Sequence, residues 1–428
     1  MYKQISEKML EFIDASPTAR FAVENIRATL ESEGYEELFE NGTWDVEEGG
    51  RYFVTRSGAS IIAFRIPRRE VCSFHAVISH TDSPSFKLKP NFDIEAKDFV
   101  RLAVDKYGGP VLDSFFDIPL SLAGSVAVSS DDGVSERLVR LEKICIIPRV
   151  APHLSKEQGT NVACDMIPFY SEGGKDGLKS RIAEELGVSN EAILSHDLYL
   201  FPSAKGIIWG EESEFVSSAR IDDLQSVYTS LAGFMNSCES STIPVFASLD
   251  NEEIGNTGVE GADSTFMSDV IKRIGISLGK NEEEYLAMLS ESFFVSADVA
   301  HARHPNHPEL YDPQNSPVLN GGVAIKYNAQ KRYTTTAVSS ALFSKIAQMA
   351  QVPCQVYTNR SDLAGGSTLG HSLQSHLSVL TLDIGAPILS MHSACETAGA
   401  KDTEYLMRVF EMFYSVSLTK EKDVYVIK

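Results

Sequence analysis

Two features of the sequence predict an α/β protein built around a largely parallel sheet. Four short apolar runs rich in Val, Ile and Phe, each leading into polar residues, are typical of buried strands. They lie at residues 71–82, 243–253, 292–302 and 378–387. Helical patterns separate these runs. Three of the runs place His, Asp or Glu at their carboxyl ends, which is where open α/β sheets bind ligands.

The helical patterns lie before, between and after the predicted strands. Apolar residues at helical spacing indicate an opening helix at Ile5, Met9, Leu10 and Ile13. A second helix face follows a pair of aspartates and consists of Leu224, Val227, Leu231 and Met235. Further helices are expected over residues 326–352 and at residues 402–417.

Residues 91–215 differ from the rest of the chain. Alternating segments such as LAGSVAVSS and LVRLEKICIIPRV are typical of strands, and DDG and EGGKDG are turn signals. A single core usually stops growing near ~250–300 residues, and this chain has 428. We therefore expect residues 91–215 to be an inserted β-rich domain between the two halves of a catalytic domain, residues 1–90 and 216–428.

Net charge, cysteine spacing and hydropathy limit the binding partners and the cellular compartment that we expect. The formal net charge of −21 argues against nucleic acid or an anionic membrane as the main partner. The acidity is explained either by solubility or by carboxylates gathered around cations. The six cysteines contain no Cys-x-x-Cys pair, so reduced and mostly buried thiols are expected. No signal peptide and no run of ~18 apolar residues is present, and a cytoplasmic protein is expected.

The first polar cluster follows the first predicted strand and contains His80 and Asp82. A histidine at such a position is more often structural than a metal ligand. If His80 binds a metal ion, its second ring nitrogen needs a hydrogen-bond partner, and Asp82 could provide it.

Two acidic pairs occupy the middle of the chain. Asp222 and Asp223 precede a predicted helix, where an aspartate is usually an N-cap; the alternative is a carboxylate that bridges two metal ions. Glu252 and Glu253 lie between an apolar strand and a Gly-containing loop, a context that favours function over a solvated helix face. Adjacent carboxylates can point in different directions, so one can bind metal while the other accepts a proton.

The remaining candidates follow the third and fourth predicted strands. Asp298 precedes several histidines, but the prolines among those histidines argue against a helix that would gather them on one face. Asp298 is therefore the stronger candidate ligand. His392 follows the last strand, and a lone histidine there is unremarkable.

Counted together, these candidates form a ligand set for two metal ions: His80, Asp222, Glu253, Asp298 and His392. Two zinc ions that share one bridging carboxylate would each have one histidine and one further carboxylate. Such sites leave positions for water and substrate, as catalysis requires. Cobalt or manganese would suit the same nitrogen and oxygen donors.

Eight segments in order resemble the aspartyl aminopeptidase family of two-zinc exopeptidases, and eight ordered matches are far more specific than any one. The segments are SHTDSPSFKLKP (79–90), YGGPVLDSFFDIPLSLAG (107–124), SARIDDL (218–224), DNEEIGNTG (250–258), SADVAHARHPN (296–306), IKYNAQKRYTT (325–335), SDLAGGSTLG (361–370) and LDIGAPILSMHSACE (382–396).

The resemblance implies a role for each candidate. His80, Asp222 and Asp298 would hold one zinc ion, and Asp222, Glu253 and His392 would hold the other. Glu252 would be the general base and acid, taking a proton from the water that zinc activates, and Asp82 would orient His80. The implied activity is hydrolysis of the N-terminal residue from unblocked peptides.

The resemblance also implies architecture and assembly. The family fold is a zinc-peptidase-like α/β/α sandwich with an inserted β-rich dimerisation domain, and its dimers assemble into tetrahedral homododecamers. A histidine after a Pro-rich approach lies at a neighbouring subunit's active site in the family, and His153 in RVAPHLSKE matches it. His153 would then donate a hydrogen bond to the oxyanion of a neighbouring subunit's reaction.

Three segments depart from the family pattern, and these departures bear on which N-terminal residue the enzyme prefers. Phe115-Phe116-Asp117-Ile118 stands where the family has Trp-Phe-Asp-Arg, and Asp223 stands where the family has Asn. Residues 365–371 read GGSTLGH, where the family has Cys-Gly-Ser-Thr-Ile-Gly-Pro. A preference for acidic N-terminal residues needs a cation, for which Lys326 is the candidate; a surface lysine is the alternative. The alternatives are a two-metal deacylase or carboxypeptidase, against which the motifs of the inserted domain argue, and a non-catalytic shell-forming relative, against which the intact Glu252 argues.

Overall fold

Four apolar strands form the parallel centre of a nine-stranded sheet in the computed structural model, which describes residues 1–95, 97–154, 160–173, 177–422 and 424–428. In spatial order they are β13 (Thr242–Leu249), β4 (Ser73–His80), β14 (Phe293–Ala297) and β18 (Leu380–Gly385). Every residue of β13, β4 and β14 is buried. Because helices cover both faces, these strands contain apolar residues on both sides, as the sequence indicated.

The margins of this sheet add antiparallel pairings, so the sheet as a whole is mixed. The marginal strands are β1 (Glu36–Glu37), β2 (Arg51–Arg56) and β3 (Ser60–Arg65) on one side and β16 (Val323–Lys326) and β17 (Cys354–Tyr357) on the other. β3 pairs with β2 and β13 in antiparallel fashion, and β16 pairs so with β18. A short turn at Ser57-Gly58 joins β2 to β3, and such a turn permits only antiparallel pairing.

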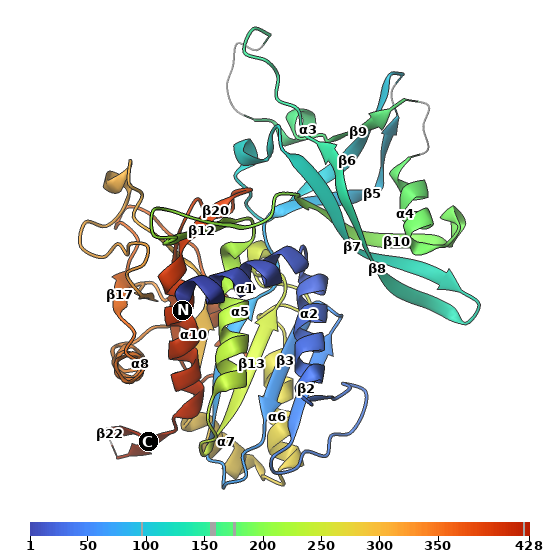
Figure 1. Ribbon diagram of the computed structural model, residues 1–428. Coiled ribbons are helices and arrows are strands. Elements are labelled where there is room, and N and C mark those ends of the chain that lie inside the picture. Colours follow the sequence, from blue (N-terminus) through green and yellow to red (C-terminus); the bar gives the residue numbers. More distant parts are fainter. Residues whose placement is uncertain (96, 155–159, 174–176, 423) are drawn as a thin grey trace.

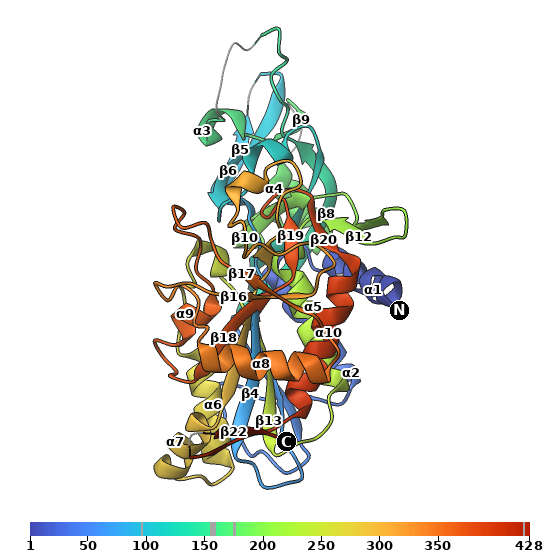
Figure 2. The same ribbon diagram turned by 90° about the vertical axis from the view of Figure 1, so that its left-hand side faces the viewer.

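Helices cover the two faces of the sheet (Figures 1 and 2). The helices of the sandwich are α1 (Tyr2–Ala15), α2 (Ala19–Ser32), α5 (Ile221–Asn236), α6 (Phe266–Ser277), α7 (Glu282–Ser290), α8 (Ala337–Met349), α9 (Leu369–Leu373) and α10 (Ala400–Ser415), whereas α3 (Val162–Asp165) and α4 (Leu178–Leu186) belong to the β-rich insertion. One hydrophobic layer joins the sheet to α1, α2, α5, α8 and α10, and another joins it to α6, α7 and α9. In β4, Val77 packs in the first layer, and its neighbours Ala76 and Ile78 pack in the second. This is the expected α/β/α sandwich.

The predicted helices occur with shifted boundaries. The opening helix is α1, and the last one is α10. The expectation of helix over residues 326–352 is wrong at its start, because Lys326 ends β16 and a loop follows it. Helix α8 begins only after Thr336, whose side chain accepts a hydrogen bond from the amide of Ser339 in a capping box.

The β-rich insertion closes into a barrel (Figure 1). In spatial order its strands are β10 (Ile193–Pro202), β5 (Ser85–Glu95), β6 (Phe99–Tyr107), β9 (Phe169–Glu172), β8 (Gly133–Ile146) and β7 (Pro119–Ser130). A separate hydrophobic cluster that includes Phe86, Leu122 and Leu198 fills it. The barrel strands therefore lie between residues 85 and 202, and the domain boundaries at 91 and 215 stay predictions.

A smaller sheet lies between the barrel and the sandwich in Figure 1. Its strands are β11 (Ile207–Trp209), β12 (Phe215–Ser218), β20 (Glu396–Gly399), β19 (Pro387–Leu389) and β15 (Ala300–His301). Strand β12 leads directly to Asp222, and β20 begins just after His392. The chain ends in a hairpin of β21 (Leu418–Glu421) and β22 (Val424–Ile427).

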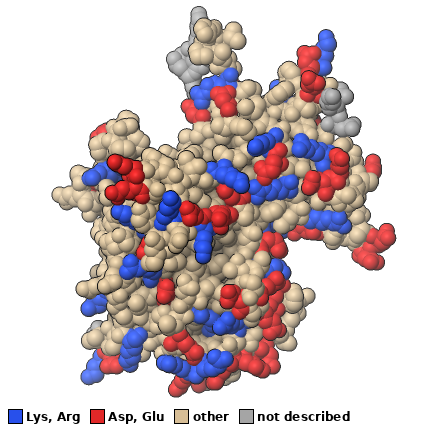
Figure 3. Space-filling model, viewed as in Figure 1, with Lys and Arg blue, Asp and Glu red and all other residues tan. Residues whose placement is uncertain are grey.

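The surface mixes both signs of charge. Figure 3 shows Lys and Arg side chains interspersed with Asp and Glu over the face that is visible. All six cysteines lie in the described part of the chain and none is paired with another, but the expectation of mostly buried thiols is wrong. Four of them are exposed, because they lie on loops, at a strand or at a helix end. No helix among the described residues is long and apolar enough to cross a membrane.

Two barrel glycines with similar backbone angles provide a test of strand packing. Gly124 in β7 has φ +148°, and a Cβ atom there would lie 2.0 Å from the carbonyl oxygen of Asp197 in β10. Gly133, the first residue of β8, has φ +143°, and a Cβ atom there would have no described atom within 4 Å. Gly124→Ala should lower the free energy of unfolding by about 1–3 kcal/mol more than Gly133→Ala, because only the first pushes two paired strands apart. Thermal unfolding of both variants measures the difference, and equal shifts would contradict this view of the β7–β10 contact.

Candidate metal centre

The candidate ligands meet at the carboxyl-terminal edge of the parallel strands. His80 is the last residue of β4, Asp298 follows β14, and Glu253 lies in the short turn after β13. Asp222 stands at the start of α5, and His392 follows β19. Parallel strands end at the same edge of a sheet, so residues scattered over more than 300 positions come together there.

Asp222 lies between the two histidines. Its Oδ1 is 3.2 Å from Nε2 of His80, and its Oδ2 is 3.4 Å from Nε2 of His392. Nε2 of His80 is also 3.8 Å from Oδ1 of Asp298, and Nε2 of His392 is 3.3 Å from Oε1 of Glu253. Each imidazole therefore faces two carboxylates, and the two imidazoles share Asp222. The side chain of Asp222 contacts these imidazoles and is not an N-cap of α5.

These spacings suit a metal ion in each group. Ligand atoms bound tetrahedrally to zinc at ~2.0–2.1 Å lie about 3.3–3.4 Å apart. The distances from each Nε2 to the facing carboxylate oxygens, 3.2 to 3.8 Å, lie near that value. Three groups of potential ligand atoms lie within reach of one ion, namely His80 with Asp222, Asp223 and Asp298; His80 with Glu252 and Glu253; and Asp222 with Glu253 and His392.

Hydrogen bonding at the far side of each imidazole fixes where its lone pair points. Nδ1 of His80 is 3.1 Å from the carbonyl oxygen of Asp82, and Nδ1 of His392 is 3.1 Å from the carbonyl oxygen of Gly109. A carbonyl only accepts, so Nδ1 carries the proton in each ring. In a neutral ring the Nε2 lone pair then faces carboxylate oxygens, and a cation between these acceptors removes the repulsion. The residues present therefore fit a metal ion at each imidazole.

Buried oxygen atoms support the same fit. Oδ1 of Asp222 and Oε1 of Glu253 are buried and accept no hydrogen bond from the described residues. Buried polar atoms are nearly always paired, and buried charges coordinate metals or pair with opposite charges. These two atoms belong to the same groups that the distances define.

Charge crowding shifts the pKa values of the cluster. Burial alone would lower the pKa of His392, but hydrogen bonding with Asp222 and the charge of Glu253 raise it to about 10. Burial, and then repulsion by Asp298 and Asp82, raises the pKa of Glu252 to about 8. Burial and repulsion by Asp222 raise the pKa of Glu253 well above its ordinary range. The cluster has more carboxylates than two imidazoles can balance, and divalent cations would reverse these shifts.

Asp82 connects His80 to the turn that carries Glu252 and Glu253. Its Oδ1 accepts a hydrogen bond from the amide of Glu252 at 3.1 Å, and its Oδ2 accepts one from the amide of Glu253 at 3.1 Å. Oδ1 is also 3.3 Å from Nδ1 of His80, although the carbonyl oxygen of Asp82 lies closer. The carboxylate thus contacts more of the centre than the single orienting contact that the sequence suggested.

Two further acids contact the centre: Glu396, to which sequence reasoning gave no role, and Asp223, which it left as an N-cap or a bridging carboxylate. Glu396 is buried and accepts hydrogen bonds from the amides of Asp222 at 2.9 Å and His392 at 2.7 Å. Asp223 is buried, accepts from the amide of His80 at 3.2 Å, and has its pKa raised well above the ordinary range by burial. Glu396 follows His392 by four residues in a matched segment, which is the signal that could have identified it.

Lys326 and His153 occupy contrasting places. Lys326 is 3% exposed, so the surface alternative is excluded, and its Nζ lies 3.0 Å from Oδ2 of Asp298. His153 is exposed on the loop that follows β8. His153 belongs to none of the potential ligand groups among the described residues.

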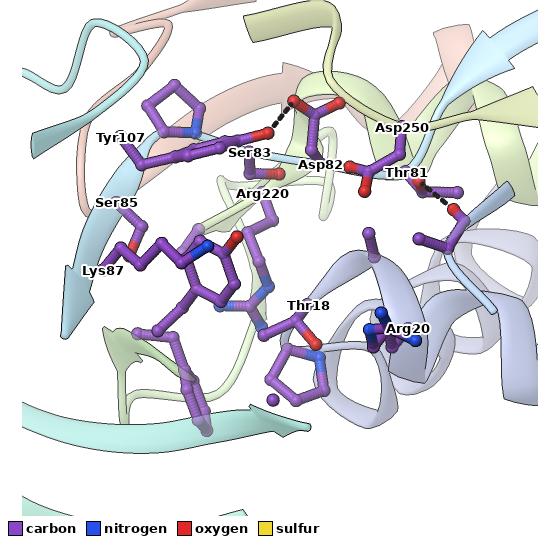
Figure 4. A pocket seen from close by; sticks show the side chains of 18 of the residues that line it. Thr18, Arg20, Thr81, Asp82, Ser83, Ser85, Lys87, Tyr107, Arg220 and Asp250 are labelled. Carbon is purple, nitrogen blue, oxygen red and sulfur yellow. Dashed lines mark hydrogen bonds between the residues drawn. The ribbon is translucent and has the colours of Figure 1, made fainter. Parts of the chain in front are cut away.

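A cavity of about 260 Å³ borders the centre on the barrel side (Figure 4). Asp82, Asp250 and Tyr107 line it toward the centre, and Thr18 and Arg220 line it toward the helices. His392 and Glu396 also line it, whereas His80, Glu253 and Asp298 do not, so the cavity opens onto the His392 side of the ligand cluster.

Comparison with known proteins gives one consistent match. The model of the family "Aminopeptidase I zinc metalloprotease (M18)" matches residues 12–414. A probable M18 family aminopeptidase 2 of Clostridium novyi is 40% identical over 96% of this chain and 99% of its own length. Aspartyl aminopeptidase 1 of Schizosaccharomyces pombe is 36% identical over 99% of this chain and 97% of its own length. The solved dodecamer of mApe1 from S. cerevesiae matches with a TM-score of 0.85 and 25% identity, covering 96% of this chain and 97% of that one.

Removal of one imidazole tests the arrangement of ligand groups. His392→Ala should lower the metal content of the dialysed protein by about one ion per chain, because its group loses the only nitrogen donor. Elemental analysis by mass spectrometry measures this. His307→Ala, which removes an exposed imidazole outside the cluster, is the matched control and should leave the content unchanged. Equal metal content in the two variants would remove His392 from the ligand set.

Proposed function

Because this chain belongs to the M18 family of zinc metalloaminopeptidases, we propose that it removes N-terminal residues from unblocked peptides with two zinc ions that share Asp222. The observation that carries the proposal is the placement of one Asp222 oxygen beside each imidazole. Family membership favours this reading over a two-metal deacylase or carboxypeptidase and over a non-catalytic shell protein.

The proposed ligand sets follow the two groups of contacts. His80, Asp222 and Asp298 hold one ion, and Asp222, Glu253 and His392 hold the other. Nδ1 of each histidine is bound by a backbone carbonyl, which keeps the ring orientation and leaves Nε2 free to bind. Zinc supplies a Lewis acid for the scissile carbonyl and lowers the pKa of the attacking water.

Glu252 performs the proton transfers in this mechanism. It stands next to Glu253 in the turn after β13, and its amide is bound by Asp82. The carboxylate takes a proton from the attacking water and returns it to the leaving amine. Burial is the largest cause of its raised pKa, and repulsion by Asp298 and Asp82 adds to it; bound cations would favour the ionised form, which is the form a base needs.

Glu252→Gln should abolish turnover while the metal content stays at the wild-type level. Glutamine keeps the shape of the side chain but accepts no proton, and loss of a general base typically costs ~10²–10⁴-fold in kcat. Turnover of aminoacyl chromogenic substrates, together with elemental analysis, measures both quantities. Glu260→Gln, an acid in the same loop outside the ligand groups, is the control. Near wild-type activity of the Glu252→Gln variant with full metal content would show that the base is another residue.

The preference for acidic N-terminal residues is a further part of the proposal, supported by the similarity to an aspartyl aminopeptidase. Lys326 is a buried cation beside Asp298, and burial opposes its charge while Asp298 and Asp383 favour it, so that its pKa is raised. A cation at that place can attract a substrate carboxylate. Its pairing with Asp298 offers a second role, which is to neutralise a metal ligand.

Lys326→Met should distinguish these two roles. If Lys326 binds the substrate side chain, kcat/KM for Asp and Glu substrates falls at least about tenfold more than for Leu and Ala substrates, since a buried charged hydrogen bond is worth ~1.5–3 kcal/mol. The measurement needs metal content at wild-type level, so that ligand loss is excluded. Equal losses on all four substrates would assign Lys326 to Asp298 alone.

Assembly is the third part of the proposal. The chain forms homodimers through its β-rich domain, and the dimers build a tetrahedral dodecamer; the dodecamer of a relative supports this. His153 lies exposed on a loop of that domain, outside its own chain's ligand groups. We assign it to the neighbouring subunit's site, where it donates a hydrogen bond to the oxyanion. Loss of such a donor typically costs ~10²–10³-fold in kcat.

Subunit mixing tests the role of His153. Glu252→Gln subunits and His153→Ala subunits are each expected to be nearly inactive alone. Mixed under conditions that exchange subunits, they should regain part of the activity, because some sites combine an intact Glu252 with a neighbour's intact His153. Native mass spectrometry confirms the exchange. Full activity of the His153→Ala variant alone, or no recovery after confirmed exchange, would contradict a role in trans.

A further inference from the structure

A tyrosine of the barrel reaches into the turn that carries the proposed base. Tyr107 is the last residue of β6, and its hydroxyl donates a hydrogen bond to Oδ2 of Asp82 at 2.8 Å. Oδ1 of Asn251 lies farther from the same hydroxyl, at 3.2 Å. Figure 4 shows Tyr107 among the residues that line the cavity, with the hydrogen bond to Asp82 drawn as a dashed line.

Asp82 depends on this hydroxyl because it is 4% exposed and has few other donors. Besides Tyr107, its carboxylate accepts from the amides of Glu252 and Glu253. A buried carboxylate needs such donors to remain charged and in place. The three bonds therefore fix the position of the carboxylate and of the backbone turn together.

Tyr107 is suited to donate and not to ionise. Burial, and then the charge of Asp82, raises the pKa of its phenol far above the ordinary value. The hydroxyl therefore keeps its proton at neutral pH. Hydrogen bonds from neutral donors to charged acceptors are shorter and stronger than those between neutral groups.

The two residues after Tyr107 contact the same centre. A Cβ atom at Gly108, which has φ +66°, would lie 3.2 Å from Cβ of Glu253. The carbonyl of Gly109 accepts from Nδ1 of His392. Residues 107–109 thus form one segment of the barrel that touches Asp82, Glu253 and His392 in succession.

We propose that Tyr107 is a positioning residue for Glu252: its hydroxyl fixes Asp82, and Asp82 holds the amides of the turn on which Glu252 stands. The proposal rests on the proposed function, in which Glu252 is the base. Under this proposal the barrel contributes to catalysis within its own chain, in addition to any contact with a neighbouring subunit.

The test compares two neighbouring tyrosines of the barrel. Tyr107→Phe removes only the hydroxyl and should lower kcat about ten- to one-hundredfold, the factor expected when a hydrogen bond to a charged group is lost. KM should stay within about threefold, and the metal content should stay at the wild-type level. The control is Tyr199→Phe. Its ring lies 5.3 Å from that of Tyr107, it lines the same cavity, and the change should alter kcat less than about twofold.

A double-mutant cycle separates action through Asp82 from a general loss of packing. The amide of Asp82→Asn has a single acceptor oxygen, so it cannot receive all three donors. In that background, loss of the Tyr107 hydroxyl should cost less than about threefold in kcat. An equal cost in both backgrounds would overturn the role through Asp82.

Two other results would overturn the proposal. Wild-type kcat in the Tyr107→Phe variant overturns the proposal, and so does a loss that added zinc restores, because the hydroxyl would then serve metal retention. Turnover by the wild-type enzyme and its abolition in Glu252→Gln test the proposed function separately. The Tyr107 result can therefore fail while the proposed function stands.

Discussion

The need to hold several buried carboxylates in contact dominates this structure. Asp222, Glu253 and Asp298 converge on two imidazoles at one edge of the sheet, and like charges that close together are costly in a low-dielectric setting. Cations balance them, but the protein must first bring the ligands together. It does so by ending parallel strands at a common edge and by fixing the backbone between them with Asp82 and Glu396.

Two acids that lie behind the proposed ligands, Glu396 and Asp82, each bind a defined pair of backbone amides. Glu396 binds the amides of Asp222 and His392, which are two of the proposed ligands of one ion. Asp82 does the same for Glu252 and Glu253. Each of these acids thus fixes two backbone amides relative to one another. The sandwich supplies the strand ends, and these acids set the final spacing.

The sequence predicted best what local patterns determine. The apolar strands β4, β13 and β14 were visible as runs, and polar residues at their ends marked His80, Glu253 and Asp298 as candidates. The antiparallel margins were not visible, because strand direction depends on pairing partners far along the chain. The start of α8 was placed too early, since the loop after Lys326 has no strong breaker until the cap at Thr336. Lys326 could be named from a motif, but whether it was buried could not be decided without the fold.

Contacts between the domains were beyond sequence reasoning for a different reason. Tyr107 and Asp82 are 25 positions apart and belong to elements whose relative placement only the folded chain defines. Gly109 and His392 are separated by 283 positions. Neither pair has a characteristic spacing. Their residues appeared in matched segments, but no pattern within one segment revealed that a barrel strand ends at the metal centre.

The contact of residues 107–109 with the centre bears on how such a protein can change over time. An inserted domain that only mediates assembly could be shortened, exchanged or lost with little effect on the host's chemistry. Here residues 107–109, at the end of β6, contact Asp82, Glu253 and His392. A substitution at this strand end is therefore expected to disturb the metal centre as well as the barrel, whereas a substitution far from it leaves these contacts in place.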